Sequence, residues 1–420
     1  MSTNREPAPR RWWQDDPLFQ QVAARLDAVA AIDHHTHLLW PGAFRPELDR
    51  HQPLGLRSAA YAQALADYFG VAVREGDLEP AARQAEQVRA ALIDRLGEHG
   101  YWLRHLDLTC TEIALVNQDF PEGTDGRRLR WVPHATTLLY PLPAAALLAR
   151  SPAHAQQIPR IQQHLRRFLA AAGLAELPRD LDGYLAFADA TLARWKEQGA
   201  VAVKLWDAYL RTLRFDDVPQ GRAQELFATG LAAPLPRDDY LALQDFLARH
   251  IFLTAGRLGL AVHIHASFGV PPFLRYQEAC VQNLEAVLTD ARYFDTTFVL
   301  IHGGLPAVEE AAYLALKPHV WLDVSAMPFL YPVPDLAARL RTCLLYAPEK
   351  VLFGTDVAAY PGVPVGPEVQ HLALCRATRQ ALSLALAGLI RDGVVDAARA
   401  IQMGEGMLRA NAQRLYGWAV

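Results

Sequence analysis

The chain has 420 residues, of which 51% are hydrophobic and 20% are charged. This length and composition suit a globular protein with a sizeable core, built as one large domain or two ordinary ones. Lys and Arg total 41 against 45 Asp and Glu, a net charge of -4. That balance excludes the basic footprint of a nucleic-acid-binding protein and gives no attraction to an anionic membrane surface.

The four cysteines are spread along the chain without CxxC spacing, which favours reduced thiols in a reducing compartment. The first residues lack the apolar core of a signal peptide, and no charge-free stretch is long enough to span a bilayer. We therefore expect a cytoplasmic protein that acts on a small-molecule substrate, with no nucleic-acid or membrane partner.

Residues 1–20 are polar and Pro-rich, and we expect a loosely held N-terminal arm there. Beyond the arm, short apolar runs typical of strands alternate with longer stretches typical of helices. This alternation predicts an α/β fold with a parallel sheet. The eight predicted strands are 30–33, 111–117, 131–139, 200–206, 260–265, 297–302, 319–325 and 350–355. Several are almost continuously hydrophobic, as in strands covered on both faces.

Eight strands with helical crossovers predict a (β/α)8 TIM barrel, here within a domain over residues 21–367. Helical stretches at 277–293, 306–316 and 334–346 separate the last four strands. A barrel of this kind needs only ~250 residues. The surplus predicts helical insertions after strands one, three and four, and extra C-terminal helices packed on the outside of the barrel. Their ranges are 40–105, 140–198, 207–259 and 368–420.

Two of the connections between predicted strands depart from a regular strand–helix repeat. The link between strands two and three, QDFPEGTDGRR, is short and rich in turn residues, so we expect an irregular crossover. The insertion 40–105 follows a barrel strand and therefore belongs to the active-site face. It is a candidate lid or subunit contact, and we expect a homo-oligomer.

Residues suited to bind a metal follow the predicted strands, at the barrel face where active sites form. The first strand ends in Asp33-His34-His35-Thr36-His37. In extended chain, residues two apart project to the same side, so His35 and His37 can bind one metal while His34 faces away. An HxH pair by itself can equally be an ordinary surface or core pair.

The later strands supply the rest of the set. His265 ends strand five and is the better ligand there, whereas His263 is expected to be a hydrogen-bonded interior histidine. His302 ends strand six beside two glycines, which leave room for a ligand. Asp356 follows an apolar strand, and a buried carboxylate needs a metal, a cation or hydrogen-bond donors. For Asp323 a hydrogen-bonded supporting role is expected rather than metal binding.

Lys204 lies in the apolar fourth strand, and its role stays open. It could form a salt bridge or extend to solvent, bind a substrate anion, or be carbamylated to bridge two metals. Tyr209 and Arg211 follow it closely and could meet an anionic substrate, or be ordinary surface residues.

Together these motifs resemble the amidohydrolase superfamily, over roughly residues 30–360. AIDHHTH resembles the family's opening xDxHxH, and HIHASFG, LIHGG and FGTD resemble its later motifs. The pattern is most similar to the branch called amidohydrolase 2, which contains hydrolases and decarboxylases. The resemblance implies a divalent metal, zinc with manganese as the alternative, in one or two ions. It assigns as metal ligands His35, His37, His265 and Asp356. His302 would hydrogen-bond the reacting group or water, or bind a second metal.

The preferred function is metal-dependent hydrolysis, in which the metal activates a water at the barrel mouth. Asp356 is the expected general base, and His302 the residue that polarises the substrate carbonyl. Non-oxidative decarboxylation of a carboxylic acid is the first alternative, because it uses the same ligands. A catalytically inactive barrel that binds a metal or ligand is the second.

Overall fold

The computed structural model of the chain describes residues 11–39, 59–73, 78–148, 152–269, 274–358 and 366–418. Half of the predicted N-terminal arm, residues 1–10, and parts of the predicted insertion 40–105 lie outside the described residues. Within the arm, residues 17–20 belong to the helix α1, Pro17–Leu26. Asp16 caps this helix and Pro17 fits its first turn, which needs no amide hydrogen.

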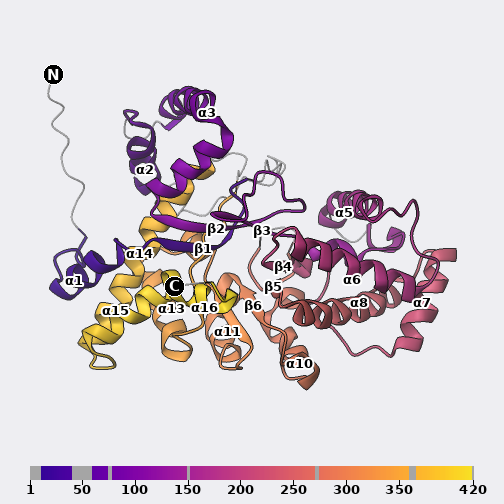
Figure 1. The fold of residues 1–420 in the computed structure, drawn as a ribbon. Helices are drawn as coiled ribbons and strands as arrows, with labels where there is room; N and C mark the ends of the chain where they lie inside the picture. The colour runs from indigo at the N-terminus through magenta and orange to yellow at the C-terminus, as the bar shows by residue number, and fades with distance from the viewer. Residues whose placement is uncertain are drawn as a thin grey trace.

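All eight predicted strands are present among the described residues (Figure 1). They are β1 Ala31–Thr36, β2 Thr111–Asn117, β3 Leu129–Val132, β4 Ala202–Leu205, β5 Ala261–His265, β6 Phe298–Ile301, β7 Val320–Asp323 and β8 Val351–Leu352. One parallel sheet has the order β1-β2-β3, and a second has the order β4-β5-β6-β7-β8. Each strand thus pairs with its neighbour in the chain, as in a fold built from repeated strand–crossover units.

Backbone hydrogen bonds also join the two sheets at both ends. Between β3 and β4, the amide of Lys204 donates to Pro133 O at 2.8 Å. Between β1 and the segment after β8, the amide of His34 donates to Phe353 O at 2.9 Å and that of His37 to Val357 O at 2.7 Å. The eight strands therefore form a closed parallel ring in chain order, the arrangement of a (β/α)8 barrel.

The prediction for the third strand was too long. The strand ends at Val132, and residues Ala135–Leu139 form a 3-10 turn instead. Pro133 explains the difference, because proline cannot donate to a strand ladder. Only an isolated bridge, His134 to Lys204, continues the pairing beyond it.

Helices fill the connections between the strands. They are α2 Ala59–Phe69, α3 Leu78–Leu108, α4 Ala145–Leu148, α5 Pro152–Ala171, α6 Leu181–Glu197, α7 Gln220–Ala232, α8 Arg237–Leu258, α9 Tyr276–Ala279, α10 Glu285–Leu288, α11 Val308–Leu314, α12 Met327–Leu330 and α13 Val333–Tyr346. The link between β2 and β3 contains no helix, as predicted. The helix expected over 277–293 is instead four short helical pieces, because Cys280 and Asp290 have extended backbones.

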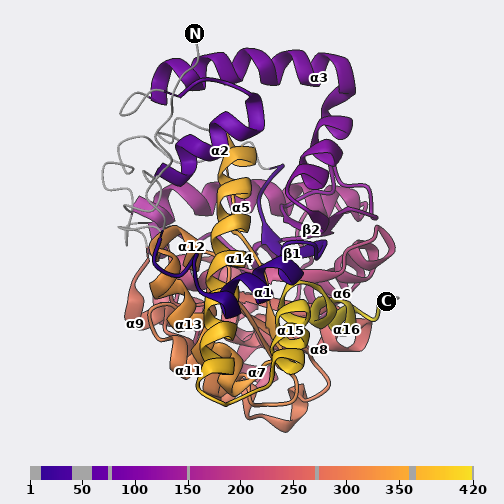
Figure 2. The ribbon, with the colours of Figure 1, turned by 90° about the vertical axis from the view of Figure 1, so that its left-hand side faces the viewer.

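The helices α2 and α3 project from one side of the ring of strands, whereas α5 to α8 lie on another side (Figure 1). The helix α3 is kinked at Gly97, which has φ +70°, a backbone conformation that favours glycine. The helices α2 and α3 share a small separate core with the start of α14, Pro367–Arg391, which runs the length of the molecule (Figure 2).

The C-terminal helices do more than pack on the outside of the barrel, where they were predicted. After α14 come α15, Ala397–Glu405, a π-helical turn, Gly406–Ala410, and α16, Asn411–Tyr416. Ala412 packs among inward-facing strand residues such as Ile32 and Ala261, at the amino ends of the strands. The last helix therefore closes the bottom of the ring. No helix in the described ranges is long and apolar enough to cross a membrane.

Candidate metal centre

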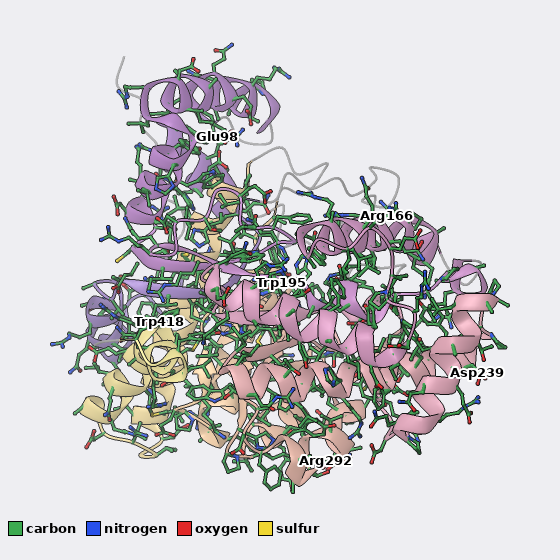
Figure 3. The ribbon with its side chains drawn as sticks, turned by 45° about the vertical axis from the view of Figure 1, so that its right-hand side comes forward. Glu98, Arg166, Trp195, Asp239, Arg292 and Trp418 are labelled. Carbon is green, nitrogen blue, oxygen red and sulfur yellow. The ribbon has the colours of Figure 1, made fainter. Side chains whose placement is uncertain are left out.

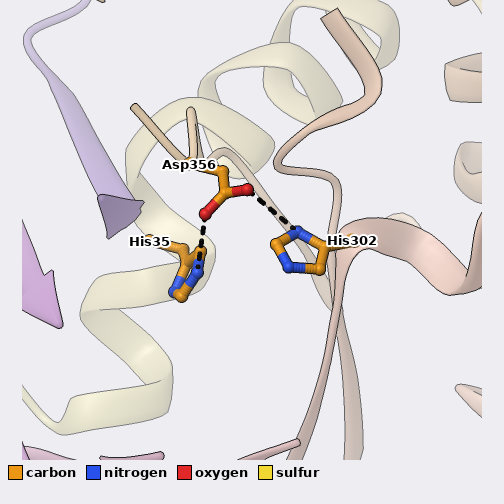
Figure 4. A group of neighbouring side chains, drawn as sticks. All are labelled: His35, His302 and Asp356. Atoms are coloured by element: carbon orange, nitrogen blue, oxygen red, sulfur yellow. Dashed lines mark ion pairs between the residues drawn. The ribbon is translucent and has the colours of Figure 1, made fainter. Parts of the chain in front are cut away.

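Three side chains from distant parts of the chain meet at the carboxyl ends of the strands (Figure 4). His35 belongs to β1, His302 follows β6 and Asp356 follows β8. Nε2 of His35 lies 3.2 Å from Oδ1 of Asp356, and Nδ1 of His302 lies 3.9 Å from its Oδ2. One ligand atom from each residue lies within 4.8 Å of the others, so this group of three could hold a metal ion.

The backbone at these strand ends is unusual. His302 has φ +71° and Asp356 has φ +60°, a region that residues other than glycine rarely adopt. Ser267 after β5 and Ala326 after β7 share this conformation. Such strain persists only where surrounding structure enforces it, and it gathers at functional sites. Here it turns the chain sharply after each strand and aims His302 and Asp356 across the mouth.

His37 adjoins this group, as the HxH spacing predicts. Its Nδ1–H donates to Asn117 O at 2.9 Å, which directs Nε2 toward the mouth. That nitrogen lies 3.5 Å from Oδ1 of Asp356, on the same carboxylate oxygen that faces His35. A carbonyl that fixes the ring of a metal-binding histidine is the usual supporting contact in metal sites.

His265, predicted as a ligand, lies beside His302 rather than within the group of three. Its Nδ1 is 3.1 Å from Nε2 of His302, and its Nε2 donates to Phe268 O. His302 thus takes the place in the closest group that the sequence assigned to His265. Of the other predicted ligands, His35 and Asp356 are in this group, whereas His37 lies beside it.

The contacts around His302 and His265 need one more proton than two neutral rings and a hydroxyl supply. Four contacts run in a row, from Phe268 O to His265, to His302, to Ser325 Oγ and to the carboxylate of Asp323. Two neutral imidazoles and one hydroxyl carry three protons for four contacts. Burial lowers the pKa of His265 to about 3 and that of His302 well below its ordinary value, so neither ring supplies a fourth.

The acid and the buried histidines have complementary protonation states. Burial acts to raise the pKa of Asp356, but His302, His37 and Lys204 outweigh it and hold that pKa below its ordinary value. Burial also lowers the pKa of His35, and neither ring nitrogen of His35 has a hydrogen-bond partner among the described residues. A carboxylate facing neutral imidazoles is a donor set that suits zinc or a similar divalent ion.

Lys204 lies deep in the same mouth. Its side chain is buried, and Nζ has no hydrogen-bond partner within the described part of the chain. Burial lowers the pKa of Lys204 to about 7, although Asp356 and Asp323 act in the opposite direction. A buried amine of this kind is uncharged in a large share of molecules near neutral pH, so it can act as a nucleophile as well as a cation.

The two other predicted substrate-side residues have different surroundings. The ring of Tyr209 is centred 4.7 Å from that of His265, so Tyr209 belongs to the mouth. Arg211 does not join it: its guanidinium forms a buried ion pair with Asp245 and donates to Thr212 O at 2.9 Å. The sequence could not reveal that partner, because Asp245 lies on α8, a separate helix.

A cluster that the sequence analysis missed adjoins the site. Asp119, just after β2, lies 3.2 Å from Nδ1 of His134, 3.1 Å from Nδ1 of His164 and 3.3 Å from Arg160. Burial acts to raise the pKa of Asp119, but the two histidines outweigh it and lower that pKa. The ring of His134 is centred 6.3 Å from that of His37. The signal was present, since Asp119 follows a buried strand as Asp356 does.

The chain is similar to known proteins in sequence and in fold. The sequence model of the family described as Amidohydrolase matches residues 32–418. A solved structure from Lactobacillus casei ATCC 334, provisionally assigned as a metal-dependent hydrolase, is 18% identical with a TM-score of 0.66, covering 94% of this chain and 97% of that one. No curated protein matches the chain.

Two isomerases have the same fold over nearly the whole chain. Uronate isomerase from Thermotoga maritima is 14% identical with a TM-score of 0.58, covering 97% of this chain and 100% of that one. Glucuronate isomerase from Caulobacter crescentus is 14% identical with a TM-score of 0.57, covering 97% and 96%. At this level of identity the likeness establishes the fold alone.

Proposed function

The chain belongs to the amidohydrolase family, and from this premise we propose that it is a metal-dependent hydrolase with its reaction centre at His35, His302 and Asp356. The observation that carries the proposal is the meeting of these three side chains, with ligand atoms within 4.8 Å of one another. Membership of the family also implies that the closed ring of strands is a TIM barrel.

The proposed metal is held by His35 and Asp356, with His37 and His302 beside the same carboxylate. Zinc is the first choice for imidazole and carboxylate ligands, and manganese is the alternative. When bound, such an ion is a Lewis acid that lowers the pKa of water to roughly 7. His265 is kept as a further ligand candidate through its contact with His302.

Asp356 is the proposed general base. Its lowered pKa keeps the carboxylate ionised at neutral pH, so it can accept a proton from the attacking water and pass it to the leaving group. His302 lies between Ser325 and His265 and faces the same carboxylate. Its proposed role is to polarise the substrate carbonyl. Tyr209 is the proposed contact for the rest of the substrate.

Lys204 decides between one metal ion and two in this proposal. Its buried amine has no hydrogen-bond partner in the described ranges. The charge of Asp356 acts to raise the pKa of this amine. Carbamylation of Lys204 would remove the buried cation and create an anionic ligand for a second ion. Metal analysis, with a crystal structure that shows whether Lys204 is modified, separates the two states.

A second candidate function is isomerisation of a sugar acid. The likeness to two uronate isomerases over 97% of this chain favours it. Decarboxylation of a carboxylic acid stays a prediction of the same centre.

One screen tests the three reactions. Metal-loaded protein is offered amides, esters and lactones, carboxylated aromatic acids with detection of carbon dioxide, and uronic acids with detection of the keto product. Hydrolysis that is abolished by chelation and restored by metal supports the proposal. Turnover of uronic or aromatic acids with none of the hydrolysable substrates would replace it with the corresponding alternative.

A further inference from the structure

A chain of buried hydrogen bonds begins at the last helix and runs up the inside of the barrel. The hydroxyl of Tyr416 lies 2.8 Å from Nε2 of His34 and 2.8 Å from Nε2 of His263. Nδ1 of His34 lies 3.1 Å from Oδ2 of Asp323. The hydroxyl of Tyr416 thus connects β1 with β5, and His34 extends the connection to Asp323 of β7.

The series of hydrogen bonds continues from Asp323 to the metal centre. The amide of Ser325 donates to Oδ1 of Asp323 at 2.9 Å, and the Ser325 hydroxyl contacts the same oxygen. The Ser325 hydroxyl also lies 3.0 Å from Nδ1 of His302. The series of hydrogen bonds therefore begins at Tyr416 and ends at His302, a member of the group that could hold a metal.

The groups from His263 to Asp323 allow one consistent set of donors and acceptors. Asp323 is a carboxylate that only accepts, so His34 donates to it through Nδ1. With the ring proton of His34 on Nδ1, Nε2 is the acceptor and the Tyr416 hydroxyl donates to it. The Tyr416 oxygen is left to accept from Nε2–H of His263. Both hydrogen-bonding capacities of Tyr416 are used, which no residue lacking a hydroxyl can reproduce.

The position of Tyr416 depends on the closure of the barrel bottom. Its ring stacks on Trp418, with centroids 4.7 Å apart and planes 21° apart. Both rings line a cavity of about 410 Å³ below the strands. Trp418 lies beside the C-terminal helices, far from Asp239 on α8 (Figure 3). The hydroxyl of Tyr416 points from the closed bottom of the barrel into the ring of strands.

We propose that Tyr416 is a positioning residue of the metal centre, which it supports through His34, Asp323 and Ser325. Without its hydroxyl, His34 and His263 each lose a buried hydrogen-bond partner, which destabilises their present arrangement. His34 can then rotate away from Asp323, which in turn frees Ser325 and the ring of His302. Loss of such outer contacts typically lowers metal affinity by about 10- to 100-fold. This inference rests on the proposed metal site.

The test is Co²⁺ binding to the chelated protein, measured by titration and by the visible spectrum of the bound ion. Tyr416→Phe removes only the hydroxyl and is expected to weaken binding by about tenfold or more and to change the spectrum. The matched control is Tyr184→Phe, whose buried hydroxyl donates to Leu138 O at 2.7 Å in another part of the fold. Tyr184→Phe is expected to bind Co²⁺ as the parent does.

A second variant keeps the inference testable if Tyr416→Phe folds poorly. Ser325→Ala cuts the same chain at its upper end and is expected to weaken Co²⁺ binding similarly. In the double variant the loss should stay close to that of the larger single, because both changes break one chain. Fully multiplying losses, or a Tyr416→Phe protein with the parent's affinity and spectrum, would overturn the inference. A parent that binds no Co²⁺ would overturn the proposed function and the inference with it.

Discussion

Nε2 of His35 lies 3.2 Å from Oδ1 of Asp356, so the first and last strands of the ring meet through their side chains. They also meet through their backbones, because the amide of Asp356 donates to His35 O at 2.7 Å. Closing the barrel and assembling the metal centre are therefore one structural event. A change that separates β1 from β8 should damage both.

Metal binding should stabilise the protein. Zn²⁺ or Mn²⁺ added to chelated protein at a free concentration one hundred times Kd is expected to raise the free energy of unfolding by about 2.7 kcal/mol. His35→Ala should abolish this gain, measured by thermal or urea unfolding with and without metal. His250→Ala is the control, since His250 also faces a carboxylate, Asp189 at 2.7 Å, but outside the site. If neither ion changes the free energy of unfolding of the parent protein, the proposed metal centre is contradicted.

Asp356→Asn should keep the shape of the side chain while removing its basicity. We expect kcat to fall by about 10²- to 10⁴-fold for any substrate that the screen identifies, because a general base contributes that much. The measurement is steady-state kinetics at saturating metal, with Asp238→Asn on the surface of α8 as the control. Retention of the parent's kcat would rule out Asp356 as the base.

Lys204 should give the chelated protein a distinctive pH dependence. Its pKa is about 7 when folded, against an ordinary value of 10.5. Between these values the unfolded chain binds more protons than the folded one, so this contribution to stability rises with pH. Relative to Lys204→Met, the parent should gain up to about 1.4 kcal/mol per pH unit above pH 7. Urea unfolding of both proteins from pH 7 to 9.5 measures it, and a constant difference would show that Lys204 is not buried as a free amine.

Arg211 should matter for stability and not for the metal. Arg211→Met leaves Asp245 buried without its partner, which is expected to cost about 3–5 kcal/mol of unfolding free energy. Stabilisation by metal should persist in the variant. Arg214→Met is the control, because Arg214 pairs with Asp216 on the surface and no measurable loss is expected. A stable Arg211→Met protein with weakened metal binding would instead show that Arg211 belongs to the functional site.

The strands could be predicted because burial leaves its mark locally. Runs such as FVLI and VWLD are apolar over their whole length, since both faces of a barrel strand are covered. The third strand was overextended for an equally local reason: the apolar residues after Pro133 form a buried turn, and hydrophobicity does not distinguish the two. The helix expected over 277–293 failed in the same way, because helical periodicity does not reveal an extended residue such as Cys280.

The sequence by itself determined the types and the order of the site residues, because each follows or ends a strand and parallel strands present their ends at one face. It pointed to His35, His37, His265, His302 and Asp356 alike. Only the tertiary structure decided that His302 lies closer to Asp356 and His35 than His265 does, since that depends on the backbone turn after β6. It alone paired Arg211 with Asp245, gathered His134 and His164 around Asp119, and brought Tyr416 under His34. The reason is physical: strand patterns record burial along the chain, whereas these partners meet only when helices far apart in sequence pack on the ring.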